Sequence, residues 1–359
     1  MNKFQLETFN VSDLEDPFFD SLKSDYLEFS DWFKKKASKN EKAYLYQENG
    51  IKAFLYLKNE YNEKSESIKL DTGIIPAESR IKIGTLKLLE TVQGMRLGEG
   101  AIGMALWYWQ SQPVNEIYVT VFDKHEKLIK MLVQFGFSCR GRNQRGENVF
   151  FKDKRNIDIS TSYSSFPYIN GEFNSCGYIP IADNFHDTLF PYSELRNTEQ
   201  ESQEIAAANG ITKVFLATPF NSIDYRKGDP VFIYRKYTGN VGKPGFKSVV
   251  TSFCTIVDMI EVKKNGRANY TLNDYLQKVG NKSVYENQEL INIYNSNKNL
   301  YLLVMLYNGY LGSGNNITYM ALKNAGYFTG YPYQVKLNKN QFENILKMGG
   351  KNVQNIIIN

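Results

Sequence analysis

Histidine and cysteine are both scarce in this 359-residue chain. The two histidines, His125 and His186, exclude a metal centre built from several histidines and leave a Ser/His/Asp triad only two candidate bases. The three cysteines lie far apart in the chain and form no CxxC pair. We therefore predict no metal site, no disulfide framework and a reducing compartment.

Long apolar runs are also missing. No stretch approaches the length of about 18 apolar residues that a membrane-spanning helix needs. The opening residues MNKFQLETFN have no basic segment followed by an apolar one, so no signal peptide is expected. These absences predict a cytoplasmic protein without a membrane partner.

Charge is spread unevenly along the chain. Residues 1–155 carry 24 basic and 22 acidic side chains, and residues 156–210 carry 1 basic and 8 acidic ones. Residues 211–359 carry 18 basic and 8 acidic side chains, a net charge of +10. This basic part indicates either a polyanionic partner or a solvated basic face without one.

Length and hydrophobic patterning predict two domains and a joining segment. Residues 1–155 alternate strands and helices in the order β-α-β-β-β-α-β-α-β, an α/β domain. Residues 156–210 read as an irregular, acidic linker, and residues 211–359 as an α+β domain with a small closed or half-closed barrel. In the first domain we expect strands at 4–10, 42–61 (a hairpin), 80–90, 115–122 and 147–153, and helices at 16–38, 100–112 and 124–137.

A glycine-rich stretch, QGMRLGEGAIGMALWYWQ at residues 93–110, lies between the strand 80–90 and a helix. Backbone N–H groups at a helix N-terminus attract anions, and glycines let a phosphate approach them closely. The stretch is neither a Walker loop, because GK[ST] is absent, nor a Rossmann fingerprint, because G-x-G-x-x-G does not fit. A pyrophosphate cradle and a simple tight turn both remain open from these residues alone.

The order of elements, the glycine loop after the fourth strand and the helix ending QFGF (134–137) together resemble the Gcn5-related N-acetyltransferase (GNAT) family. The resemblance covers residues 1–155 and implies that acetyl-CoA is the cofactor. It places the pyrophosphate on the loop of Met95, Arg96, Leu97, Gly98, Glu99, Gly100 and Ala101, and the pantetheine arm along Leu88, Leu89 and Glu90. The loop begins with Met95, where the family has Gln or Arg.

The catalytic residues of that family transfer less directly. Many members carry a tyrosine acid where this chain has Leu132. A carboxylate near the acetyl group could act as the general base, and Glu90 is the candidate, with a surface or capping role as the alternative. Tyr118 is the candidate acid, and His125 is expected to start its helix.

A second resemblance involves GITKVFLATPFNSIDYRKGDPVFIYRKY and the following KPGFKSVVTSF, which look like the PUA-like superfamily in its ASCH or EVE branches. The segment PIADNFHDTLFP (180–191) resembles one found where such domains are fused behind an acetyltransferase. The resemblance implies an RNA-binding cleft. Cationic and aromatic side chains suit phosphates and bases, and the expected RNA contacts are Tyr225, Arg226, Lys227, Tyr234, Arg235, Lys236, Lys247, Ser248 and Thr251.

Three functions follow as hypotheses. The first is an acetyl-CoA-dependent N-acetyltransferase whose acceptor amine belongs to an RNA, such as a tRNA or an aminoacyl-tRNA. The second is an RNA-binding module, or reader of modified bases, with a degenerate acetyltransferase scaffold. The third is a protein N-acetyltransferase with a partner encoded nearby, in a toxin–antitoxin or defence system.

Overall fold

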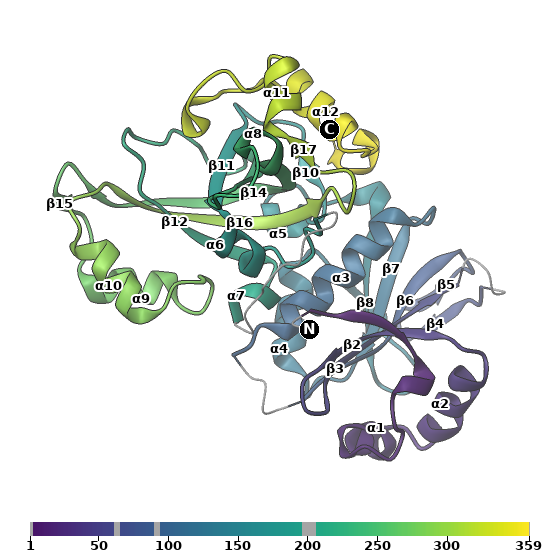
Figure 1. The fold of residues 1–359 in the computed structure, drawn as a ribbon. Coiled ribbons are helices and arrows are strands. Elements are labelled where there is room, and N and C mark those ends of the chain that lie inside the picture. Colours follow the sequence, from purple (N-terminus) through teal and green to yellow (C-terminus); the bar gives the residue numbers. More distant parts are fainter. Residues whose placement is uncertain (1–2, 61–64, 90–93, 196–205, 359) are drawn as a thin grey trace. The chain divides into compact units, whose positions relative to one another are not determined.

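The computed structural model describes residues 3–60, 65–89, 94–195 and 206–358 (Figure 1). The chain forms two compact units, Met1–Ile157 and Asp158–Asn359. Both units combine a large mixed sheet with helices, as the sequence predicts. No helix among the described residues is long and apolar enough to span a bilayer.

The first unit is built on a seven-stranded sheet with the order β1-β2-β3-β6-β7-β9-β8. Only the β6–β7 pair is parallel, and the other neighbours are antiparallel. Its strands are β1 Gln5–Thr8, β2 Lys42–Gln47, β3 Ile51–Asn59, β6 Arg80–Leu88, β7 Glu116–Val121, β8 Ser138–Arg142 and β9 Asn148–Asp153; β4 Ile68–Leu70 and β5 Gly73–Ile75 form a separate hairpin.

Helices cover both faces of this sheet, which is why four successive residues of β3, Ala53 to Tyr56, are all buried. On one face, Phe54 and Tyr56 join an aromatic cluster with Phe9, Phe19 and Phe33. The other face is covered by α3, which packs against β3, β6, β7 and α4. The helices of this unit are α1 Asp20–Asp25, α2 Phe29–Ser38, α3 Leu97–Ser111 and α4 Glu126–Gln134.

Sequence patterning predicts most of these elements and misses some. The expected helix at 16–38 is two helices, because Tyr26 adopts an extended backbone (φ −135°, ψ 99°) that ends α1. The short strand β8 was not expected. The hairpin at 42–61 is present, and its turn uses positive φ at Asn49 and Gly50.

A buried ion pair fixes the start of the parallel β6–β7 ladder. Arg80 and Glu116 are register partners, and Arg80 Nε lies 2.5 Å from a Glu116 carboxylate oxygen, with both side chains at most 3% exposed. Arg140 Nη1 contacts the other oxygen at 2.7 Å. Both oxygens of the carboxylate are thus engaged, as a buried charge requires.

The second unit is a half-barrel sheet with the order β11-β13-β14-β16-β12, whose edge strands β11 and β12 do not pair with each other. The long strands β14 and β16 extend beyond it and carry α9 and α10 at their far end (Figure 1). The strands are β10 Ile169–Asn170, β11 Gly177–Ala182, β12 Thr212–Ala217, β13 Pro230–Lys236, β14 Val249–Lys264, β15 Arg267–Ala268, β16 Leu300–Tyr310, β17 Ile317–Thr318 and β18 Ile357–Ile358.

Two apolar clusters hold this unit together. The larger packs α12 against the sheet through Tyr178, Phe232, Phe253 and Phe342. The smaller joins α9 and α10 to β12, β14 and β16. The helices are α5 Ser162–Ser165, α6 Asp183–Leu189, α7 Ala206–Asn209, α8 Pro244–Lys247, α9 Leu272–Val279, α10 Asn287–Asn295, α11 Tyr319–Asn324 and α12 Lys339–Met348.

The expected linker at 156–210 is not a linker along its described length. β11 pairs in parallel with β13 from Gly177↔Val231 to Ala182↔Lys236, so it is an edge strand of the second sheet. α6 follows it and buries His186 and Leu189. The second unit therefore begins at Asp158, and the sequence obscures this because the segment is acidic and its strand is short.

The buried ion pair gives a stability prediction. Changing Glu116→Gln leaves the Arg80 guanidinium buried without its carboxylate, so we expect the free energy of unfolding to fall by about 3–5 kcal/mol in urea denaturation. The control is Glu78→Gln, since Glu78 is 32% exposed and lies 3.7 Å from Arg80; its expected cost is below about 1 kcal/mol. Equal losses in the two variants would contradict the assignment.

Candidate active site

A cavity of about 1600 Å³ lies in the first unit, where β6 and β7 separate. The two strands pair only from Arg80↔Glu116 to Ile83↔Val119. Beyond that point β6 stays with β3 as far as Leu88, and β7 stays with β9 as far as Val121. The opening between them is lined by the first turn of α3, α4, the α1–α2 segment and the hairpin that joins β8 to β9.

The separation has a local cause in β6. Tyr56 pairs with Thr85 and Leu57 with Ile83, so Gly84 is the extra residue of a β-bulge, which bends its strand. A Cβ at Gly84 would lie 2.8 Å from the Tyr56 ring, so the close approach at this point requires glycine.

The bend leaves backbone groups of β6 facing the cavity. The Leu89 N–H donates to the Lys52 carbonyl of β3 at 2.9 Å. Because hydrogen-bonding direction alternates along a strand, the N–H and C=O groups of Leu86 and Leu88 point away from β3, toward the side from which β7 has diverged. An extended ligand could pair with that edge.

The N-terminus of α3 lines the same cavity. Arg96 precedes the helix in the left-handed conformation (φ 57°, ψ 20°), and Leu97, Gly98 and Glu99 form its first turn. The N–H groups of a first turn have no partner within the helix and favour an anion. The Arg96 guanidinium lies 2.6 Å from the Glu99 carboxylate, which offsets the one negative side chain in that turn.

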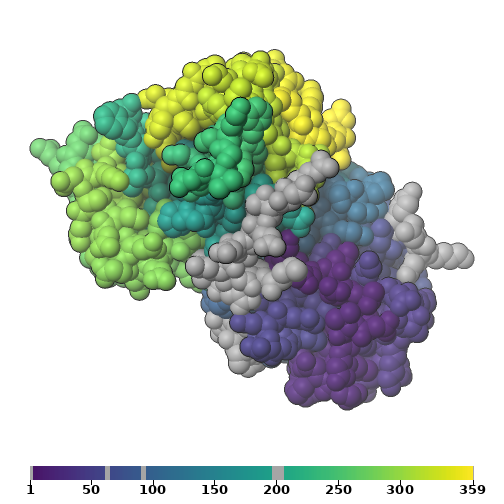
Figure 2. All heavy atoms as spheres, viewed as in Figure 1, coloured from purple at the N-terminus to yellow at the C-terminus, as the bar shows by residue number. Residues whose placement is uncertain are grey.

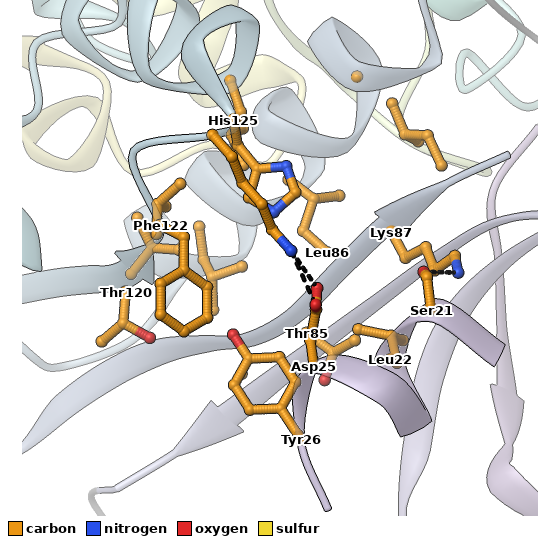
Figure 3. A pocket seen from close by; sticks show the side chains of 18 of the residues that line it. Ser21, Leu22, Asp25, Tyr26, Thr85, Leu86, Lys87, Thr120, Phe122 and His125 are labelled. Carbon is orange, nitrogen blue, oxygen red and sulfur yellow. Dashed lines mark hydrogen bonds and ion pairs between the residues drawn. The ribbon is translucent and has the colours of Figure 1, made fainter. Parts of the chain in front are cut away.

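The opposite wall holds a hydrogen-bonded carboxylate, that of Glu147, at the end of the β8–β9 hairpin. Its Oε1 accepts from the Tyr26 hydroxyl at 2.8 Å and from Thr120 Oγ1 at 3.2 Å, and its Oε2 accepts from Asn143 Nδ2 at 2.7 Å. Figure 3 shows Tyr26 and Thr120 next to each other on this wall, with His125 across the cavity. Burial and the bond to Glu147 raise the pKa of Tyr26.

Cations also line the cavity. Lys124 pairs with Asp25 at 2.7 Å, and Lys87 donates to the Ser21 hydroxyl (Figure 3). Lys82 has no hydrogen bond or ion pair within the described part of the chain; its ammonium lies 5.6 Å from the centre of the Tyr118 ring. Burial lowers the pKa of Lys82.

Most of the predicted cofactor residues lie at this cavity. Leu88, Leu89, Arg96, Leu97, Gly98 and Glu99 line it. Gly100 and Ala101 are buried in α3, and Met95 is half-buried and does not line the cavity. Glu90, the expected base, lies outside the described residues. His125 does precede α4, as predicted, and burial lowers its pKa.

The candidate acid Tyr118 is not in the cavity, which corrects the sequence-based assignment. Its ring stacks on Phe151 at 5.3 Å and packs under the β4–β5 hairpin, and its hydroxyl donates to Glu60 at 3.1 Å. Burial raises its pKa further above the ordinary value. Tyr26 and Glu147 were not singled out from the sequence, because 121 positions separate them and no local motif connects them.

The predicted RNA contacts of the second unit divide between surface and interior. Tyr225, Tyr234, Arg235, Ser248 and Thr251 are all buried, at 8% exposure or less, and so cannot contact RNA in this structure. Arg226, Lys227, Lys236 and Lys247 are exposed. They form two groups, because the seven residues of β13 place its ends about 20 Å apart.

Arg235 instead belongs to an interior polar network. Its Nε and Nη2 contact the two Asp187 oxygens at 2.7 and 2.8 Å. His186, which is fully buried, bonds Asp187 through Nδ1 and Thr251 through Nε2, both at 2.8 Å. Burial alone would raise the pKa of Asp187, but the bonds from Arg235 and His186 hold it below its ordinary value.

Parts of this chain are similar to solved structures of two kinds. A mutant ZmASCH protein from Zymomonas mobilis matches at a TM-score of 0.32 and 11% identity, over 48% of this chain and 95% of its own. NAA60 from Arabidopsis thaliana, in complex with a bisubstrate analogue, matches at 0.30 and 16%, over 42% and 98%. AtaTR bound with AcCoA matches at 0.31 and 17%, over 43% and 96%.

No protein-family profile matches the chain, and no curated protein matches it. Within the described residues, no group of three or more His, Cys, Asp or Glu side chains is placed to hold a metal ion.

The buried position of Arg235 can be tested by comparing the stability of an Arg235 variant with that of a variant of the exposed Lys236. Arg235→Met leaves the Asp187 carboxylate buried without its arginine and bonded only to His186, so we expect a loss of about 3–5 kcal/mol in urea denaturation at pH 7, whereas Lys236→Met should change stability by less than about 0.5 kcal/mol. The lowered pKa of Asp187 means that its stabilising effect is complete above the ordinary value for aspartate, about 4, and is lost as pH falls below it. The difference between wild type and Arg235→Met should therefore shrink below about pH 4; an undiminished difference would contradict the ion pair.

Proposed function

We propose that the first unit is an acetyl-CoA-dependent N-acetyltransferase. The observation that carries this proposal is the opening between β6 and β7. A helix N-terminus faces it, and so does an edge of β6 that pairs with no strand among the described residues. One end suits a pyrophosphate and the other suits the amides of an extended pantetheine chain. The cavity volume of about 1600 Å³ exceeds the range of roughly 300–1000 Å³ that is common for ligand pockets, as expected for a long ligand.

The residues present fit coenzyme A. The N–H groups of Leu97, Gly98 and Glu99 would hold the phosphates, and Gly98 leaves the first turn of α3 without a side chain facing Leu88. Leu86 and Leu88 would hold the pantetheine amides through their backbone. When bound, the cofactor would supply an acetyl thioester.

We expect the protein to accelerate the reaction mainly by orienting the two reactants, and less by donating a proton to the leaving thiolate. α4 carries the aliphatic Leu132 at the position where a tyrosine acid was expected, and a leucine side chain has no proton to donate. Binding of the donor and acceptor on opposite walls of one cavity is the main expected source of rate acceleration.

Isothermal titration with coenzyme A tests the cradle. We expect binding by the wild type and at least ~10-fold weaker binding by Gly98→Val, because the added side chain would cover the first-turn amides. Its Cβ would lie 3.1 Å from Leu88 Cδ1, a contact that a small shift of the leucine can relieve. Ser111→Val, at the exposed end of the same helix, is the control. No binding by the wild type at millimolar concentration would defeat the proposal.

For the second unit we propose contact with RNA. The proposed surface contains fewer of the residues expected from the sequence, because five of those nine are buried. This basic-aromatic surface consists of Lys236, Tyr237, Lys243, Phe246 and Lys247. The segment that carries it, residues 236–247, can be followed in Figure 2 by the mid-green of the colour bar just below residue 250. Phe246 is 59% exposed, and the Lys247 ammonium lies 4.8 Å from the centre of the Tyr237 ring. Lysines neutralise phosphates, and exposed rings offer faces on which bases stack.

RNA binding through this surface should depend on salt. In a filter-binding titration with an unstructured oligonucleotide, Lys236→Ala with Lys247→Ala should weaken binding and reduce the slope of log K against log [salt] by about 1.4, or about 0.7 for each lysine. The control is Lys298→Ala with Lys347→Ala, which removes two exposed lysines from other elements. An equal effect of both pairs would indicate that only the net charge of the unit matters.

Together these proposals favour an acceptor amine carried by an RNA, with a tRNA or an aminoacyl-tRNA as the first candidates. Transfer of labelled acetyl groups to aminoacyl-tRNA but not to deacylated tRNA would support this. Label in protein alone would indicate a protein N-acetyltransferase. RNA binding without any transfer would indicate a degenerate scaffold.

A further inference from the structure

We propose that Glu147 is the carboxylate that binds the acceptor ammonium and takes its proton, and that Tyr26 positions it. This inference deepens the proposed function and rests on it, since it assumes an acyl donor on the α3 side of the opening. It identifies a base in the described part of the chain and makes a primary alkylammonium the acceptor group.

Glu147 differs from every other described carboxylate that lines the cavity. The others each have a cation within 4 Å: Asp20 with Lys23 at 3.6 Å, Asp25 with Lys124 at 2.7 Å, Glu28 with Arg145 at 2.5 Å, Glu99 with Arg96 at 2.6 Å and Glu126 with Lys130 at 3.8 Å. Among the described residues, the side chains that donate hydrogen bonds to Glu147 are all neutral, namely Tyr26, Thr120 and Asn143. The Lys82 ammonium on the same cavity acts on Glu147 electrostatically but forms no ion pair with it. It is also the most buried of the six, at 3% exposure.

A buried anion held only by neutral groups is costly unless a cation joins it. Three donors fix the position of this carboxylate, and an ammonium ligand would supply a cation in direct contact, which Lys82 does not. The wall beside it is aromatic, since the Tyr26 ring packs against Phe122 with 6.0 Å between the ring centres and both line the cavity. The site therefore fits a primary amine next to an apolar or aromatic group.

Glu147 also lies close to the point at which β6 and β7 separate, where the acyl group is expected. Its partner Thr120 directly follows Val119, the last β7 residue that pairs with β6. Side chains alternate along a strand, so Thr120 shares the face of Tyr118 and Phe151, while Val119 and Val121 face the other side. An amine at Glu147 would approach the opening from the α1–α2 wall, opposite the first turn of α3.

The proton and electron balance is simple. Glu147 takes one proton from the R–NH3⁺ acceptor, and the neutral nitrogen attacks the carbonyl carbon of the acetyl thioester. The C–N bond forms, the C–S bond breaks, and the sulfur leaves with the electron pair and a second proton from the nitrogen. The products are the N-acetyl amide and the free thiol, and Glu147 returns its proton to solvent.

The test uses L-phenylalaninamide, an aromatic primary amine without a carboxylate, on the full chain. Binding of the amine is measured with the chain saturated with coenzyme A, and acetylation is measured with acetyl-CoA as the donor. We expect Glu147→Gln to weaken binding of this amine in isothermal titration at least ~10-fold and to lower kcat/KM for its acetylation by about 10²–10⁴-fold. Tyr26→Phe should give a smaller loss of the same kind. Affinity for coenzyme A should stay within about twofold of wild type in both variants, because neither residue faces α3.

The matched control is Glu60→Gln. Glu60 is also buried, at 8% exposure, and also accepts from a tyrosine hydroxyl, that of Tyr118, but it does not line the cavity. Its variant should bind and acetylate the amine like the wild type.

Equal losses in Glu147→Gln and Glu60→Gln would overturn the assignment, as would amine binding that is unchanged in Glu147→Gln or absent in the wild type. Thermal denaturation shows whether Glu147→Gln is folded. Tyr26→Phe keeps the carboxylate and removes only one hydrogen bond to it, so a partial loss of amine binding in this variant supports the site even if Glu147→Gln does not fold. Failure to bind coenzyme A would defeat the proposed function instead, and the amine titration of the unliganded chain would then still decide whether Glu147 binds a cation.

Discussion

The short parallel ladder between β6 and β7 is the constraint on which the first unit depends. The Arg80–Glu116 ion pair closes one end of this ladder, where burial makes the pairing of the two charges mandatory. Four residues later, the bulge at Gly84 turns β6 toward β3 and away from β7. The two strands are therefore paired at one end and separated at the other, and the cavity lies where they separate.

That opening explains why both candidate binding features meet in one place. The first turn of α3 and the free edge of β6 lie on one side, and the Tyr26–Glu147 pair lies on the other. A ligand that reaches both must pass through the sheet. Coenzyme A on one side and an amine on the other would bring two reactants together without a dedicated catalytic motif, because orientation does most of the work.

In the second unit, one of the cations of the basic segment is buried in an ion pair and is not available at the surface. Arg235 is adjacent to Lys236 in the sequence, yet it is buried against Asp187, while Lys236 remains exposed at the end of β13. Alternation along a strand decides which of two neighbouring cations faces the interior. The described part of the acidic segment, which supplies β11 and Asp187, thus belongs to the folded second unit rather than to a spacer.

Local sequence patterns were enough for the two-unit organisation, most of the strands and helices, and the glycine loop that begins α3, because hydrophobic periodicity and glycine placement act over a few residues. The same patterns could not exclude Tyr118 or find Glu147, since each depends on which face of a sheet a side chain occupies and on partners more than 50 positions away. Only the tertiary structure decided the course of β6 and the pairing of charges inside the cavity and the barrel. The physical reason is that burial and ion pairing are set by the sum of long-range contacts, whereas helix and strand formation begins with neighbours in the chain.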